Sequence, residues 1–232
     1  MKEKWRGQMF LPWAVIGLQV IVLVACSSNS NKLAKNYYEQ GQIFYERMEY
    51  DRSIDNYTQA LEIEPSGREN YKIYFDRGRA YFKNRDYEKA IYDYTRALEL
   101  TPNSENESRF IILEARGHAY LLNKQYEQSI RDFSNALALK PRHAFAKFIY
   151  NNRAWDYYNM QQFDKAIDDF TKAISIDSKF DSAYYGRGQT WYQKGDLERA
   201  MFDAKEALRL SPGVKKYDDF LFDVKSSTKT DK

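Results

Sequence analysis

Few residues in this chain of 232 have side chains whose chemistry goes beyond packing and solvation. Cys26 is the only cysteine, and His118 and His143 are the only histidines. A single thiol can be acylated or alkylated, but it cannot form an internal disulfide. The histidines lie far apart in sequence, and no nucleophile triad, phosphate-cradling glycine loop or metal-ligand spacing accompanies them. The sequence therefore predicts no enzyme, no cofactor and no metal site, and it leaves modification of Cys26 as the chemistry to explain.

The residues before Cys26 predict a secretion signal. The first six residues carry three basic side chains and one acidic one, and residues 10–25 carry no charge. A basic start followed by an apolar stretch is typical of a leader that directs export. The apolar run is shorter than the roughly 20 residues that cross a bilayer. Leu23-Val24-Ala25-Cys26 also resembles the bacterial lipobox, in which a diacylglycerol is attached to the cysteine and the chain is cut just before it.

The lipobox resemblance implies a lipid-anchored protein of the bacterial cell envelope. Residues 1–25 would be the signal peptide, Cys26 the new N-terminus with fatty acids such as palmitate, and residues 26–33 a flexible tether. Ser27 is compatible with sorting to the periplasmic face of the outer membrane in a Gram-negative cell. An uncleaved membrane helix with an incidental cysteine is the alternative.

Composition and charge exclude one class of partner. The formal net charge is +3, and it falls to about +1 without the leader, which carries three basic residues and one acidic residue. Nucleic-acid binding needs a concentrated basic face, so we expect no nucleic-acid partner. The many tyrosines and few prolines favour helices packed through aromatic side chains over disorder.

The elements that would carry a binding site come from an internal repeat. Five segments align without gaps, among them "YFDRGRAYFKNRDYEKAIYDYTRALELTP" from Tyr74 and "LEARGHAYLLNKQYEQSIRDFSNALALKP" from Leu113. Each contains two stretches of helical period. The pattern resembles the tetratricopeptide repeat, whose period is about 34 residues. The resemblance implies an all-α solenoid of helical hairpins. The expected parts are units at 34–67, 71–104, 110–143, 147–180 and 181–214, a capping helix at 215–225 and a solvated tail at 226–232.

Small residues and prolines mark how each hairpin should close. Glycine stands at one position of the first helix in four units, where two helices must approach closely, and Ala154 fills that position in the fourth. Proline follows the second helix in four units and should end it. Ser178 replaces that proline in the fourth unit, which leaves the end of that helix open.

Two polar positions change together from unit to unit. Where the first helix has arginine, the second helix has aspartate 16 residues later; where it has Gln40, the second has Asn56. We expect the two side chains to meet between the helices of a unit, four times as an ion pair and once as an amide pair. Descent from one duplicated ancestor is the alternative. The expected ion pairs are Arg77–Asp93, Arg116–Asp132, Arg153–Asp169 and Arg187–Asp203.

The family resemblance implies a concave groove lined by the first helix of each unit. Aromatic residues at these positions either bind a ligand or pack neighbouring units together, and the sequence does not separate the two. Arg79 and Lys83 are not continued by basic residues in the third unit, which argues against the family's clamp for a C-terminal carboxylate. The expected groove residues are Tyr38, Tyr45, Phe75, Arg79, Phe82, Glu114, His118, Leu121, Asn151, Trp155, Tyr158, Asn159, Tyr185, Gln189 and Tyr192.

These features predict a lipid-anchored scaffold or adaptor that binds another protein or peptide in its groove and supports assembly of a membrane or envelope complex. Tyrosine and tryptophan are common anchors of protein interfaces, and asparagine side chains can pair with a peptide backbone. A lipoprotein that binds small hydrophobic ligands and works with a transporter is the alternative.

Overall fold

The computed structural model describes residues 13–141 and 143–230, with side chains from residue 29 to 228 apart from 142. Within these residues the chain forms eleven helices and no strand. The helices are α1 (Trp13–Glu46), α2 (Tyr50–Ile63), α3 (Asn70–Lys83), α4 (Tyr87–Leu100), α5 (Asn106–Leu122), α6 (Tyr126–Leu139), α7 (Ala146–Asn159), α8 (Phe163–Ile176), α9 (Asp181–Gln193), α10 (Leu197–Leu210) and α11 (Lys215–Thr230).

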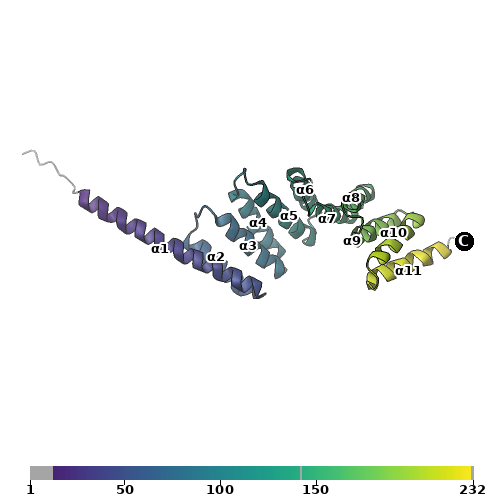
Figure 1. Ribbon diagram of the computed structural model, residues 1–232, viewed down its shortest axis with the longest axis horizontal. Coiled ribbons are helices and arrows are strands. Elements are labelled where there is room, and N and C mark those ends of the chain that lie inside the picture. Colours follow the sequence, from purple (N-terminus) through teal and green to yellow (C-terminus); the bar gives the residue numbers. More distant parts are fainter. Residues whose placement is uncertain (1–12, 142, 231–232) are drawn as a thin grey trace, which may run out of the picture.

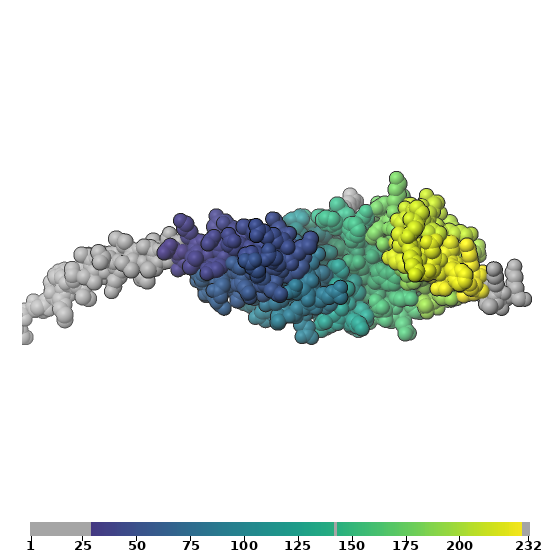
Figure 2. All heavy atoms as spheres, turned by 90° about the horizontal axis from the view of Figure 1, so that it is seen from below, coloured from purple at the N-terminus to yellow at the C-terminus, as the bar shows by residue number. Residues whose placement is uncertain are grey.

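Helices α1 to α10 pair into five hairpins that follow one another along the long axis of the molecule (Figure 1). The colours of Figure 2 run in sequence order from purple to yellow, because each hairpin packs only on its neighbours. We call the hairpins units 1 to 5, from α1–α2 to α9–α10. Helix α11 packs on α9 and α10 and covers the end of unit 5. The predicted all-α solenoid with a capping helix is confirmed.

The first helix of every unit ends in the same tight turn. In unit 3, the N–H of Lys124 donates to the carbonyl of Leu121 at 3.0 Å, and the N–H of Gln125 donates to the carbonyl of Tyr120 at 2.9 Å. This pair of bonds is a Schellman motif, which needs a residue in the left-handed region. Lys124 has φ of 60°. The equivalent residues in the other units, all with positive φ, are Met48, Arg85, Gln161 and Gly195.

Close approach between the helices of a unit explains the glycines. A Cβ on Gly78 would lie 2.8 Å from the ring of Tyr94, which is too close for any side chain. Unit 4 has Ala154 at this position, fully buried. There the equivalent ring, Phe170, lies against Gly186 of unit 5, where an added Cβ would come within 2.3 Å of it. Unit 5 therefore has Gly186 at the contact with the Phe170 ring, in addition to Gly188 at the aligned position.

The predicted arginine–aspartate pairs are confirmed in units 2 to 5. In unit 3, Arg116 Nε and Nη2 donate to the two carboxylate oxygens of Asp132 at 2.7 and 2.9 Å. The amide pair predicted for unit 1 is wrong: Gln40 is exposed, and Asn56 donates to the backbone carbonyl of Arg52 at 2.8 Å. The other three ion pairs, each with two hydrogen bonds, are Arg77–Asp93, Arg153–Asp169 and Arg187–Asp203.

Each of these arginines also reaches the preceding unit, which the sequence analysis did not predict. Arg116 Nη1 donates to the hydroxyl of Thr95 on α4 at 3.0 Å. One guanidinium therefore joins both helices of its own unit to the second helix of the unit before it. The three equivalent bonds are Arg77 to Thr58, Arg153 to Ser134 and Arg187 to Thr171.

At both ends of the described chain the terminal helix is longer than the sequence predicts. Helix α1 runs without a break from residue 13 to residue 46, so residues 26–33, expected as a flexible tether, are helical. No glycine or proline interrupts the sequence between Gly17 and Gly41, which allows the helix to propagate. Helix α11 extends to Thr230 and includes most of the expected tail. Residues 1–12 of the expected leader and the Cys26 side chain lie outside the described part. Helix α8 ends at Ile176, at the position equivalent to the ends of the other second helices, although Ser178 replaces the proline that follows them.

Candidate binding groove

The first helices of the units form the inner face of the solenoid. Each of α1, α3, α5, α7 and α9 touches the next member of this series, whereas the second helices of neighbouring units do not touch one another. The array therefore curves with the first helices on the inside. This places the predicted groove residues on the elements that form the concave face.

A pocket of about 250 Å³ opens on this face where units 1, 2 and 3 meet. The guanidinium of Arg79 lies 4.6 Å from the ring centroid of Tyr45 and bonds Asp76 at 3.3 Å. The rings of Phe82 and His118 lie 5.2 Å apart. The structure thus brings together residues predicted from three units. The full lining is Tyr45, Arg79, Phe82, Lys83, Tyr94, Glu114, Ala115 and His118.

Two charged groups of this pocket, Glu114 and Lys83, have no ionic partner among the described residues. Burial raises the pKa of Glu114, and no hydrogen bond or ion pair of this carboxyl is found among the described residues. Burial, and then the charge of Lys83, lower the pKa of His118, so the imidazole is neutral at pH 7. Lys83 is exposed and has no carboxylate partner in the described part of the chain. The pocket therefore offers a cation, an acceptor or acid, and a neutral imidazole beside aromatic rings.

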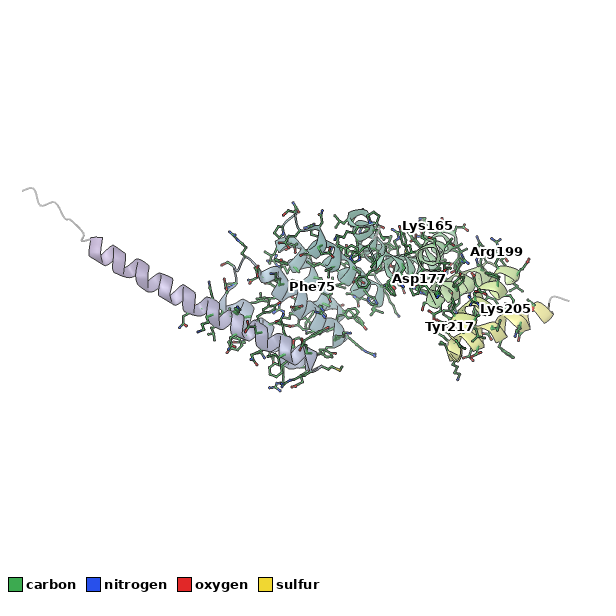
Figure 3. All side chains as sticks on the ribbon, in the orientation of Figure 1. Phe75, Lys165, Asp177, Arg199, Lys205 and Tyr217 are labelled. Carbon is green, nitrogen blue, oxygen red and sulfur yellow. The ribbon has the colours of Figure 1, made fainter. Side chains whose placement is uncertain are left out.

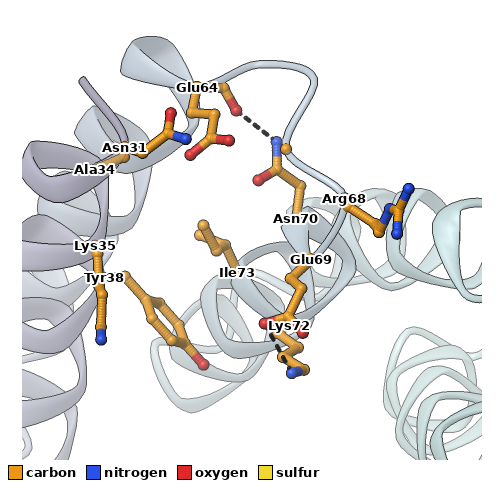
Figure 4. Close-up of a pocket in the computed structure, with 11 residues that line it drawn as sticks. Asn31, Ala34, Lys35, Tyr38, Glu64, Arg68, Glu69, Asn70, Lys72 and Ile73 are labelled. Carbon is orange, nitrogen blue, oxygen red and sulfur yellow. Dashed lines mark hydrogen bonds and ion pairs between the residues drawn. The ribbon is translucent and has the colours of Figure 1, made fainter. Parts of the chain in front are cut away.

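Two further hollows lie beside the same first helices, nearer the N-terminal ends of α3 and α5. One of about 190 Å³, mostly apolar, is lined by Tyr38, Phe75 and Ile112 among others; Figure 3 labels Phe75 on α3. The other, of about 350 Å³, lies between α1 and α3 (Figure 4). Its rim is the turn before α3, which Asn70 fixes by donating to the carbonyl of Glu64 at 2.7 Å. Tyr38 lines both hollows, so they are adjacent.

The groove residues predicted in units 4 and 5 pack mainly on one another. Trp155 lies 5.3 Å from both Tyr158 and Phe170, measured between ring centroids. Tyr185 stacks on Tyr217 of α11 at 5.1 Å. Three of the remaining members also have partners within the chain: Gln189 donates to Tyr185, Asn159 donates to the carbonyl of Trp155, and Tyr192 bonds Ser227. Asn151 is buried, and its side-chain oxygen has no hydrogen-bond partner among the described residues.

The ranges that protein-family models match agree with the boundaries of the hairpins. Models described as "Tetratricopeptide repeat" match residues 71–104, 112–143, 148–180 and 182–214, together more than half of the chain. The chain belongs to the tetratricopeptide repeat family. The matched ranges begin at unit 2, so unit 1 is assigned as a tetratricopeptide repeat by its hairpin geometry. A search of curated proteins found no significant match.

Solved structures with a similar fold align with most of the chain. "Crystal structure of MamA protein" is 23% identical with a TM-score of 0.68, covering 80% of this chain and 96% of that one. "MamA 41-end from Desulfovibrio magneticus RS-1" is 20% identical with a TM-score of 0.70, covering 78% and 97%. "Crystal structure of YrrB: a TPR protein with an unusual peptide-binding site" is 18% identical with a TM-score of 0.67, covering 82% and 90%. At these identities the likeness shows the tetratricopeptide repeat fold.

Sequence reasoning missed some residues of the groove. Asp76 accepts a hydrogen bond from the Tyr38 hydroxyl at 2.8 Å and also pairs with Arg79, so it ties units 1 and 2 together on the concave face. It precedes Arg79, a predicted groove position, by three residues, and this spacing places both on one helix face, which was the available signal. Lys72 and Tyr71 also line the groove, but they precede the aligned segment.

Within the described residues no helix is both long and apolar enough to cross a membrane, and no three metal-binding side chains cluster.

Proposed function

We propose that this protein is a scaffold that binds an extended segment of a partner protein in its concave groove, with the main recognition in units 1 to 3. The carrying observation is the pocket at the junction of these units, where Lys83 and Glu114 have no partner beside aromatic rings. The partly buried carboxyl of Glu114 is costly to leave without a partner unless a ligand satisfies it. Lys83 is exposed and is free to pair with a carboxylate of that ligand. The peptide-binding site named for the YrrB structure supports this proposal by analogy of fold.

The size and order of the hollows favour a peptide over a compact ligand. The three hollows have volumes of about 190 to 350 Å³, at or below the lower end of the 300–1,000 Å³ typical of small-molecule sites. They follow one another along α1 and α3, from the level of Tyr45 and Lys83 back to that of Asn31 and Asn70. Side-chain pockets for an extended segment lie in such a row. A segment with an apolar side chain for the Phe75 hollow and a polar or charged one for the Glu114 pocket fits this row.

A pair of photoreactive residues tests the groove. One replaces Leu122, which is 43% exposed at the position of unit 3 equivalent to Lys83, and the matched control replaces Tyr92, which is 62% exposed on α4. We expect one dominant partner to be captured in cells from position 122 and not from position 92, and to be lost when Glu114→Ala is added. Equal capture from both positions, or capture unaffected by Glu114→Ala, would contradict the proposed groove.

Lipid anchoring through Cys26 is the second part of the proposal. We propose that the chain is cut before this residue and held at a bacterial envelope membrane, where the scaffold supports assembly of a protein complex. The lipobox-like sequence around Cys26 carries this part. Metabolic labelling with an alkyne fatty acid should mark the wild type and not Cys26→Ser, and the variant should leave the membrane fraction. Equal labelling of both proteins would refute the lipid anchor.

A small hydrophobic ligand is the second candidate, and the mostly apolar hollow beside Phe75 favours it. Native mass spectrometry of protein purified without detergent measures this directly. A bound apolar species that disappears with Phe75→Ala would favour the ligand-binding function. Protein without any bound species would leave the peptide groove as the better proposal.

A further inference from the structure

Asp156 occupies an unusual place in the junction between units 3 and 4. It lies on α7 with a relative exposure of 0%, and neither carboxylate oxygen has a hydrogen-bond partner among the described residues. The side chain faces α6, where Ser129 is the polar group that affects its pKa. The Ser129 hydroxyl donates its one proton to the carbonyl of Gly117 at 2.8 Å, so it has no proton to donate to an ionised Asp156.

Units 2, 3 and 5, which like unit 4 follow another unit, show what this position holds. The equivalent residues of units 2 and 3 are Ala80 and Ala119, both fully buried. In unit 5 the equivalent is Thr190, whose hydroxyl donates to the carbonyl of Gly186 at 2.7 Å. The position therefore accommodates a small side chain that is apolar or satisfied within its own helix. A carboxyl group is compatible with it only in the neutral form, because an unpaired buried charge is strongly unfavourable.

The surroundings supply no compensating charge. Burial raises the pKa of Asp156 to about 7, opposed in small part by the Ser129 hydroxyl, and no charged group of the neighbouring helices α5, α6, α8 and α9 contributes. The buried arginines of α5 and α7 could act as counter-charges, but both are engaged elsewhere: Arg116 pairs with Asp132, and Arg153 pairs with Asp169.

We propose that Asp156 makes the junction of units 3 and 4 a proton-dependent joint, closed when the carboxyl is protonated and loosened when it ionises. The joint lies between the hollows of units 1 to 3 and the aromatic region of units 4 and 5, so loosening it changes how the two parts of the solenoid are held together. The inference depends on the packing of α6 against α7 and stands whether or not the groove binds a peptide.

The sign of the pH dependence follows from the direction of the shift. The folded protein holds the Asp156 proton more tightly than the unfolded chain, where an aspartate titrates near 3.9. The contribution of Asp156 to the stability of the fold is therefore fully present below the pKa of the unfolded chain, and it is lost as the pH rises to about 7. A carboxylate whose pKa is lowered by a cation changes stability in the opposite direction, but Glu114, whose pKa burial also raises, changes it in the same direction as Asp156. The contribution of Asp156 is therefore recognised by comparison with a variant that lacks its carboxyl.

The test compares the wild type with Asp156→Ala, which places the residue of units 2 and 3 in unit 4. Denaturant unfolding of the full chains at pH 5 and pH 8 gives the ratio of their unfolding equilibrium constants. Between these pH values we expect the wild type to lose stability relative to the variant by on the order of 10²-fold. Glu114 and His118 also titrate, but both chains contain them, so their effects cancel in the ratio. A ratio that does not change with pH would overturn the proposal.

Hydrogen exchange shows which helices are loosened when Asp156 ionises. After correction for the intrinsic pH dependence of exchange, amides of α6 and α7 should lose protection between pH 5 and pH 8 in the wild type, while those of α3 and α4 keep theirs. Asp156→Asn, which has nearly the same shape and does not ionise, should show no such change in α6 and α7. Loss of protection in this variant as well would show that the carboxyl proton is not the cause.

Discussion

Unit 1 and the four units after it share a hairpin but are held by different interactions. In unit 1, Gln40 points to solvent and Asn56 bonds within its own helix. In unit 3, the equivalent Arg116 is 15% exposed and binds Asp132 with two hydrogen bonds. The hairpin of unit 1 forms without this ion pair, so the ion pair is not what closes a hairpin.

The difference follows from what stands before each unit. Every arginine of units 2 to 5 also donates to a threonine or serine of the preceding unit, and unit 1 has no preceding unit. At the other end, unit 5 has Lys205 where a threonine or serine would stand (Figure 3), and the next helix has Leu221 in place of the arginine. The arginine therefore belongs to the junction between units, and its absence marks both ends of the array.

The largest effect is expected from breaking one junction. Arg116→Met leaves the nearly buried Asp132 without its counter-charge, which should lower the free energy of unfolding by about 3–5 kcal/mol. Denaturant titration measures it. Gln40→Met in unit 1 is the matched control, and because Gln40 is exposed we expect a change below about 0.5 kcal/mol.

The double variant Arg116→Met/Asp132→Leu separates the charge from the packing. It removes both partners, so it should be more stable than Arg116→Met alone. If the single variant were no less stable than the double one, the ion pair would not contribute as described.

A smaller effect is expected from the bond between units. Thr95→Val keeps the shape of the side chain and removes the acceptor for Arg116 Nη1, so it should cost about 1 kcal/mol. A double-mutant cycle with Arg116→Met isolates the contact. An equal cost of Thr95→Val with and without Arg116 would show that the threonine does not act through the arginine.

These junctions also show how far the sequence predicts the structure. The co-variation of the two polar positions was enough to predict four ion pairs, because it is a relation inside each aligned segment. The hydrogen bond from Arg116 to Thr95 joins different units, and nothing in the sequence around Thr95 distinguishes it from other helix residues. The same limit applies to the groove. The first helices were predictable from the repeat, but whether Trp155 would be available to a ligand or packed on Phe170 depends on how neighbouring units are placed.

The smallest effect concerns a feature that unit 1 does share with the others. Lys124 and Met48 occupy the left-handed position of the turn inside a hairpin, where a side chain costs about 1–2 kcal/mol. Only unit 5 has glycine there, Gly195. Lys124→Gly should raise the free energy of unfolding by about 0.5–1 kcal/mol, because the relief of strain exceeds the added freedom of the unfolded chain.

Met48→Gly should give a similar gain in unit 1, since the 74% exposed side chain loses little packing. Gly195→Ala should give a loss of about 1 kcal/mol, and an added Cβ there meets no atom within 4 Å, so the loss would come from the backbone. The turn joins the two helices of one unit, whereas the arginine joins neighbouring units. Substitutions at the turn should therefore have similar effects in all five units. A gain in unit 3 without a gain in unit 1 would mean that the first hairpin also depends on its neighbour.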